Sequence, residues 1–155
     1  MSDTVILSEG EEFDYVIKEV SKYLHLYVMA FEKEERTITR IDKRENMYGG
    51  NGTVYLIQMF DQKELANNRL AAYMVLLNKG DESGFHTHNL RNEQELYVVV
   101  HGAGEYRERT GTEGAIRKKM LEKGDITAIS SIGYHSVENT GDEPLILFVI
   151  TTYLP

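Results

Sequence analysis

The sequence of 155 residues contains no cysteine. Without thiols, the chain cannot form disulfide bonds, use a cysteine nucleophile or hold a metal through thiolates. Basic residues are also in the minority, with 17 Lys and Arg against 25 Asp and Glu, which gives a net charge of −8. A negative charge of this size disfavours nucleic acids and anionic membrane surfaces, and we expect neither as a partner.

Long hydrophobic runs are absent as well. No stretch approaches the roughly 20 apolar residues that cross a membrane as a helix. The first ten residues, Met-Ser-Asp-Thr-Val-Ile-Leu-Ser-Glu-Gly, lack the basic start and the apolar run of a signal peptide. We therefore expect a soluble cytoplasmic protein, and its length suits one domain with an adequate hydrophobic core.

The sequence does contain many short strand-like segments separated by glycine-rich turns. Apolar residues at helical spacing between Phe13 and Leu24 predict one amphipathic helix, opened by the capping box Ser8-Glu-Gly-Glu11. Residues 26–31 fit either a continuation of this helix or a first strand. Short strands at regular intervals are typical of a small barrel or sandwich. The predicted strands are 37–41, 53–60, 70–77, 95–101, 104–109, 115–120, 124–129, 134–138 and 145–153, with a one-turn helix at 61–64.

The residues suited to chemistry gather in residues 80–102 and 124–139. His86 and His88 stand two apart, so in an extended segment their imidazoles project from one face and can reach one cation. Glu95 opens the next apolar strand and needs a positive partner there, because an unpaired buried carboxylate is costly. His135 follows in the second segment. Imidazole and carboxylate together are ligands of first-row divalent metals.

These residues resemble the two signature motifs of the cupin superfamily. The first motif reads G-x5-H-x-H-x3–4-E-x6-G, and the second reads G-x5-P-x-G-x2-H-x3-N. The matching residues are Gly80, His86, His88, Glu95 and Gly102 for the first motif, and Gly124, His135 and Asn139 for the second.

The chain departs from these motifs in two places. Six residues separate His88 from Glu95, as in the cupin-type phosphoglucose isomerases, and Ser130 and Ile132 replace the usual proline and glycine of a turn. Glu93 matches the shorter family spacing and is the rival to Glu95. We prefer Glu95, which lies one full strand before Gly102, and interpret Glu93 as a solvated rim residue.

The resemblance implies an all-β fold, a double-stranded β-helix or jelly-roll barrel, with the short N-terminal helix packed on it. We assign residues 1–50 to this helix and extra strands, and residues 51–155 to the cupin domain. A glycine-rich turn at residues 47–52 is similar to single-domain cupins of the mannose-6-phosphate isomerase-like type. The extra strands in residues 25–60 could pair across a two-fold axis, so we expect a homodimer.

The resemblance also implies a metal site made of His86, His88, Glu95 and His135. The cofactor would be a divalent transition metal (Mn, Fe, Co, Ni, Zn or Cu), with positions left open for a ligand. The alternative is a similar barrel without metal. Glu95 is either a ligand or a proton shuttle beside the metal, and Tyr97, on the same face, either orients substrate or packs in the core. Glu95 and Tyr97 are the catalytic candidates.

Three function classes remain open for a small-molecule partner. The leading one is an isomerase or epimerase acting on a small carbonyl-bearing or sugar-like molecule. The others are a metal-dependent dioxygenase or decarboxylase-type cupin, and a non-catalytic binding cupin. Cations for a phosphate are few, chiefly Arg69 and Arg91, and this weakens a sugar phosphate as the substrate. The aromatic residues Phe85, Tyr73, Tyr97 and Tyr134 indicate an apolar cavity lining instead.

Overall fold

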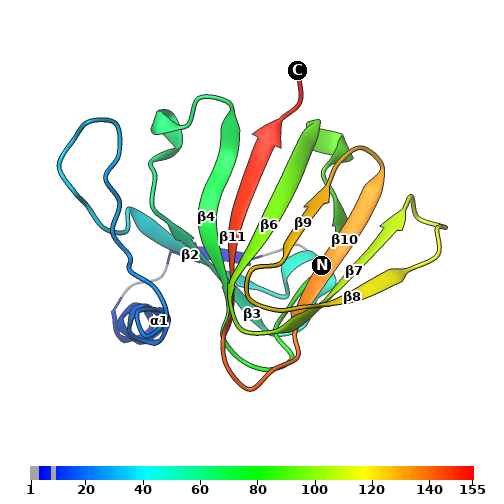
Figure 1. The fold of residues 1–155 in the computed structure, drawn as a ribbon, viewed down its shortest axis with the longest axis horizontal. Coiled ribbons are helices and arrows are strands. Elements are labelled where there is room, and N and C mark those ends of the chain that lie inside the picture. The colour runs from blue at the N-terminus through cyan, green and yellow to red at the C-terminus, as the bar shows by residue number, and fades with distance from the viewer. Residues whose placement is uncertain (1–3, 8–9) are drawn as a thin grey trace.

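The fold is an all-β barrel with one short helix packed outside it (Figure 1). The computed structural model describes residues 4–7 and 10–155. Two antiparallel sheets, of seven and four strands, form the barrel. The predicted jelly-roll barrel with a short N-terminal helix is therefore confirmed. No helix within the described ranges is long and apolar enough to span a membrane.

The larger sheet is built around the last strand of the chain. Strand β11 (Leu145–Tyr153) is apolar over most of its length and buried at its start, and it pairs with β4 on one side and β6 on the other, as expected for the predicted strand 145–153. Across the sheet the strands are β1 (Thr4–Leu7), β2 (Arg40–Glu45), β3 (Thr53–Gln58), β4 (Asn68–Leu76), β11 (Leu145–Tyr153), β6 (Glu93–His101) and β9 (Ile126–Ile129).

The smaller sheet brings the two motif segments side by side. Its central strand β10 pairs with β5 on one side and with β7 on the other. Strands β7 and β8 form the hairpin that the sequence predicts around residues 104–120. The order across this sheet is β5 (Glu82–Thr87), β10 (Gly133–Asn139), β7 (Gly104–Thr110) and β8 (Arg117–Leu121).

Two apolar clusters hold these elements together. One fills the barrel between the sheets, and the other joins helix α1 (Glu11–Val20) to the outer side of the larger sheet. Val16 and Val20 on α1 are fully buried in the outer cluster beside Ile41 and Ile57. The amphipathic spacing of the helix therefore reflects packing on the barrel. The helix is capped by Gly10 without a side-chain hydrogen bond, and Ser8 of the predicted capping box lies outside the described residues.

The N-terminal third departs most from the sequence prediction. Residues 26–31 are neither helix nor strand. An isolated bridge between Val28 and Arg36 and a hydrogen bond from the Thr37 hydroxyl to the carbonyl of Leu26 order this loop. The strand expected at 37–41 begins at Arg40 and runs to Glu45, so its charged half was missed. Strand β2 pairs with β3 in one continuous sheet, and the proposed domain boundary at residue 50 stays a prediction.

The loop between α1 and β2 lies at one edge of the fold (Figure 1). Leu26 in it is buried against the outer cluster, but three hydrophobic side chains are exposed. Tyr27, Met29 and Phe31 are 63%, 80% and 48% exposed. Exposed apolar groups this close together favour a protein contact, which agrees with the expected homodimer. We predict that Met29→Lys shifts the protein towards monomer. Light scattering that finds only the monomer mass of 17.8 kDa for the unaltered chain would contradict the dimer.

Candidate metal centre

Strand register brings the four predicted metal ligands to one point inside the barrel. His86 on β5 and His135 on β10 are direct cross-strand partners, and His88 follows just after the end of β5. Glu95 reaches the same point from β6 in the opposite sheet. One nitrogen or oxygen atom from each of the four lies within 4.8 Å of all the others, and all four residues are buried.

The atoms that converge are the three Nε2 nitrogens and one carboxylate oxygen. Oε1 of Glu95 lies 3.2 Å from Nε2 of His88, 3.3 Å from Nε2 of His135 and 3.9 Å from Nε2 of His86. The Nε2 atoms of His86 and His135 are 3.1 Å apart. Metal bonds to these atoms are about 2.0–2.2 Å long, so neighbouring ligands around one ion stand about 3.0–3.5 Å apart. The spacing fits a divalent cation.

Each histidine is held by its other ring nitrogen. Nδ1 of His86 is 2.8 Å from the carbonyl oxygen of Gly84, and Nδ1 of His88 is 3.2 Å from Oε1 of Glu93. Nδ1 of His135 is 3.2 Å from the hydroxyl of Tyr106. The carbonyl and the carboxylate can only accept, so they place the proton of His86 and His88 on Nδ1 and leave the lone pair of Nε2 facing the centre. The Tyr106 hydroxyl can accept from His135 in the same way. Partners of this kind usually orient histidine ligands of metals.

Charge balance also favours a cation at this point. Burial raises the pKa of a carboxyl, but hydrogen bonds with the three histidines outweigh it and hold the pKa of Glu95 well below its usual range. Among the described residues no Lys or Arg pairs with this carboxylate. Burial lowers the pKa of His135 to about 4, despite the opposing hydrogen bond with Glu95. This imidazole is therefore neutral at pH 7 and able to coordinate a metal. A metal needs such neutral imidazoles.

His88 lies between two carboxylates. Burial lowers its pKa, but the hydrogen bonds and charges of Glu95 and Glu93 outweigh burial and raise it. A proton or a metal ion therefore competes for Nε2 of His88, which faces Oε1 of Glu95 at 3.2 Å. The donor set, its spacing and its negative charge together fit a divalent transition metal.

The prediction from the sequence that Glu93 is a solvated rim residue is wrong. Its side chain is completely buried, and its carboxylate binds Nε of Arg69 at 2.6 Å, Nε of Arg91 at 3.1 Å and Nδ1 of His88. Two arginines and an imidazole compensate the cost of burying this charge. The strand parity already contained the signal, because Glu93, Glu95 and Tyr97 alternate onto the same inward face.

Two further supporting residues were missed from the sequence. Thr151 stands directly opposite Glu95 in the pairing of β11 with β6, and its hydroxyl donates a hydrogen bond of 2.6 Å to Oε2 of Glu95. Tyr48, in the glycine-rich turn, stacks on His86 with ring centroids 3.9 Å apart. A Cβ atom on Gly84 would lie 2.8 Å from the backbone nitrogen of Gly50, so only glycines let this turn approach β5.

Tyr97 is buried beside the four clustered residues, as its parity predicts. It is 2% exposed, and its ring stacks on that of His135 with centroids 5.0 Å apart. Burial first, and then the charge of Glu95, raise the pKa of Tyr97 well above its usual value. Tyr97 is thus a neutral phenol in contact with a candidate ligand, while its catalytic role stays a prediction.

A small cavity of about 20 Å³ opens beside His86 and Glu95. This volume has room for about one water molecule. Arg44 and Arg69 line it, so it is more cationic than the sequence indicated. The predicted aromatic lining is largely wrong. Of the four aromatic residues named for it only Tyr97 lines this cavity, whereas Tyr73 packs in the outer cluster, and Phe85 and Tyr134 stack against Arg109.

Comparison with known proteins agrees with this architecture. The chain is 28% identical over 117 residues to the oxalate-binding protein of Thermotoga maritima, covering 76% of this chain and 88% of that protein. A solved structure of a predicted oxalate decarboxylase from Thermotoga maritima superposes with a TM-score of 0.65 and 29% identity, over 76% of this chain and 94% of that one.

More distant likeness concerns the fold alone. The cupin domain of Schizosaccharomyces pombe Cnp3 has a TM-score of 0.55 at 12% identity, over 83% of this chain and 85% of that one. The family model of the cupin domain matches residues 73–151, which is more than half of the chain and includes all four clustered residues. The chain therefore belongs to the cupin family.

Proposed function

We propose that this cupin binds a divalent transition metal through His86, His88, Glu95 and His135, and that the loaded site takes up a small organic acid. The observation that carries the proposal is that Arg44 and Arg69 line the same small cavity as His86 and Glu95. Although Arg69 also pairs with Glu93, its guanidinium group, that of Arg44 and a metal cation around one space favour a carboxylate. The names of the two Thermotoga maritima relatives support oxalate as a member of this ligand class.

Different residues would bind the metal and orient the organic acid. Glu95 acts as a ligand in this proposal, because Oε1 faces the three Nε2 atoms while Oε2 accepts from Thr151. When bound, the metal would supply Lewis-acid polarisation of the ligand's oxygen. Arg44 and Arg69 would orient a carboxylate, and Tyr97 and Tyr48 would exclude water from one side of the cavity.

The proposal selects a different ligand from the leading sequence interpretation. An isomerase acting on a neutral sugar-like molecule does not need the two arginines, whereas the decarboxylase-type and binding-only alternatives use an acid. Glu95 is the only carboxylate that lines the cavity in the described chain. As a metal ligand it is not free to transfer a proton, and this favours binding over turnover.

Calorimetry on the metal-loaded protein tests the proposal. We expect oxalate to bind with an affinity that disappears after chelation and returns when the metal is restored. Neutral sugars of similar size should not bind. Product analysis in the same samples separates binding from turnover. Binding of a sugar or sugar phosphate with no binding of any small acid would instead support the isomerase.

A further inference from the structure

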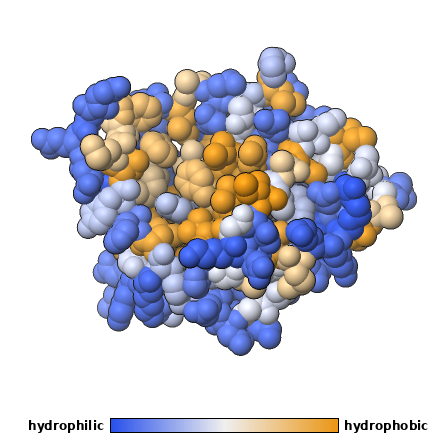
Figure 2. Space-filling model, in the orientation of Figure 1, coloured by the Kyte–Doolittle hydropathy of each residue, from blue (hydrophilic) through white to orange (hydrophobic). Residues whose placement is uncertain are grey.

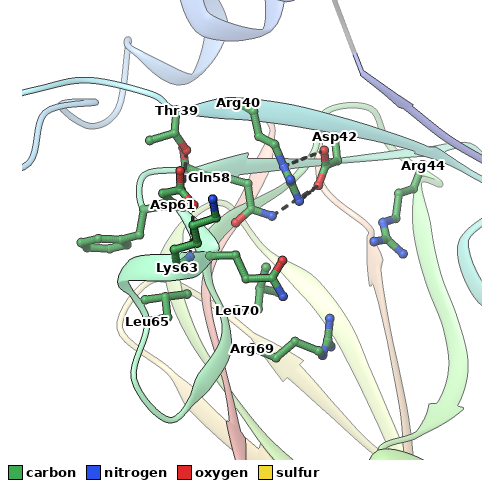
Figure 3. Close-up of a pocket in the computed structure, with 12 residues that line it drawn as sticks. Thr39, Arg40, Asp42, Arg44, Gln58, Asp61, Lys63, Leu65, Arg69 and Leu70 are labelled. Carbon is green, nitrogen blue, oxygen red and sulfur yellow. Dashed lines mark hydrogen bonds and ion pairs between the residues drawn. The ribbon is translucent and has the colours of Figure 1, made fainter.

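A larger pocket shares part of its lining with the metal-facing cavity. Figure 3 shows the residues that line it. The pocket has a volume of about 350 Å³ and is formed by β2, β3, the one-turn helix η2 (Gln62–Glu64) and the start of β4. Arg44, Arg69 and Leu70 line both spaces, so they form a shared wall.

The pocket is cationic although the chain as a whole carries a charge of −8. Arg40, Arg44, Lys63 and Arg69 line it. It also contains Asp42 and Asp61, but both carboxylates are already engaged. Those engagements are an ion pair of Asp42 with Arg40 at 3.2 Å, a hydrogen bond to Asp42 from Gln58 at 3.4 Å, and a hydrogen bond to Asp61 from the backbone nitrogen of Lys63 at 3.1 Å.

Lys63 is the cation best placed to take an added anion. Within the described ranges no carboxylate forms an ion pair with its ammonium group, and Figure 3 shows the side chain among Gln58 and Asp61 at the pocket. The guanidinium groups of Arg44 and Arg69 lie on the other side of the same pocket in that view. The cations therefore run from the outer pocket to the wall of the metal-facing cavity.

The two volumes limit the shape of a ligand. The inner cavity, at about 20 Å³, has room for about one water molecule, so it can take one oxygen of a carboxylate but not the rest of an organic acid. The remainder must pass the wall of Arg44, Arg69 and Leu70 and lie in the outer pocket. A second negative group on that remainder would meet Lys63 there, whereas Arg40 already pairs with Asp42. Such charge-assisted contacts are among the stronger polar interactions in proteins.

We infer that the ligand of this site is an elongated dianion, with one carboxylate at the metal-facing cavity and a second anionic group, a carboxylate or a phosphate, in the outer pocket at Lys63. The inference rests on the proposed function and makes it more specific, because a protein that binds only oxalate would not prefer a longer dianion.

The test compares diacids of increasing length on the metal-loaded protein. Calorimetry with oxalate, succinate, glutarate and a phosphate-terminated acid of similar length gives the affinities. We expect one of the longer dianions to bind about tenfold more tightly than oxalate. Lys63→Glu should remove this gain and leave the oxalate affinity within about twofold. Lys79→Glu is the control, because it makes the same charge change at an exposed turn outside the pocket.

Each other result has a distinct meaning. Equal affinities for all lengths, or an equal loss of affinity in both lysine variants, would overturn the elongated ligand and leave the proposed function standing. If neither oxalate nor any longer acid binds the metal-loaded protein, the proposed function fails and this inference fails with it. A gain for the phosphate-terminated acid alone would identify phosphate as the outer group.

Discussion

Replacing His88 with alanine should strongly weaken metal binding while leaving the barrel folded. A four-ligand site contributes roughly 10–16 kcal/mol of binding free energy, and removing one ligand removes about a quarter of it. We therefore expect binding about 100- to 1000-fold weaker. The barrel has its own apolar core in strands β4, β6 and β11, so its circular dichroism should not change. Elemental analysis of the dialysed protein measures the metal content.

A matched control distinguishes the loss of a candidate metal ligand from the loss of any histidine. His25 is exposed and lies outside the cluster, so His25→Ala should keep full metal content. Metal added to the unaltered protein should raise its melting temperature, because the ligand binds the native state only, and this shift should disappear in His88→Ala. Unfolded spectra for His88→Ala would show a structural metal, and an unchanged metal content would contradict the proposed ligand set.

Much of the fold follows from local sequence rules, whereas the grouping of the four candidate ligands follows from the resemblance to the cupin motifs. Period-two alternation places residues on the inner or outer face of a strand, and this places Glu95 and Tyr97 inside the barrel. The apolar run 145–153 gives the bounds of β11 because a strand buried on both faces needs continuous hydrophobic residues. The pairing of His86 with His135 needs the register of β5 and β10, which a family motif supplies and periodicity does not.

The errors fall where long-range contacts decide the structure. The charged strand β2 has no apolar alternation, so its sequence does not predict a strand. It forms because its pairing with β3 and its contact with α1 stabilise it. Arg44, on this strand, was overlooked as a lining residue for the same reason. Glu93 was misplaced because a carboxylate is usually solvated unless paired. Its partner Arg69 is 24 residues away in sequence, so only the fold shows the pair.

Glu93→Gln should weaken metal binding without removing any of the four candidate ligands. The glutamine keeps the shape of Glu93 but loses the charge that compensates Arg69 and Arg91, and it holds Nδ1 of His88 less firmly. Loss of such a supporting partner typically costs about 10- to 100-fold in metal affinity. Breaking a buried ion pair lowers the free energy of unfolding by about 3–5 kcal/mol. For Glu93→Gln we expect a loss of about 2–3 kcal/mol, because both arginines are partly exposed.

The control is a carboxylate with similar arginine bonds but no histidine. Glu64 pairs with both terminal nitrogens of Arg36, and it lies outside the cluster of candidate ligands. Glu64→Gln should lower the free energy of unfolding in urea yet leave metal affinity unchanged, whereas Glu93→Gln should lower both. Equal metal affinity in the two variants would show that Glu93 only neutralises its arginines. A loss confined to Glu93→Gln would assign it to orienting His88, because only that carboxylate contacts a candidate ligand.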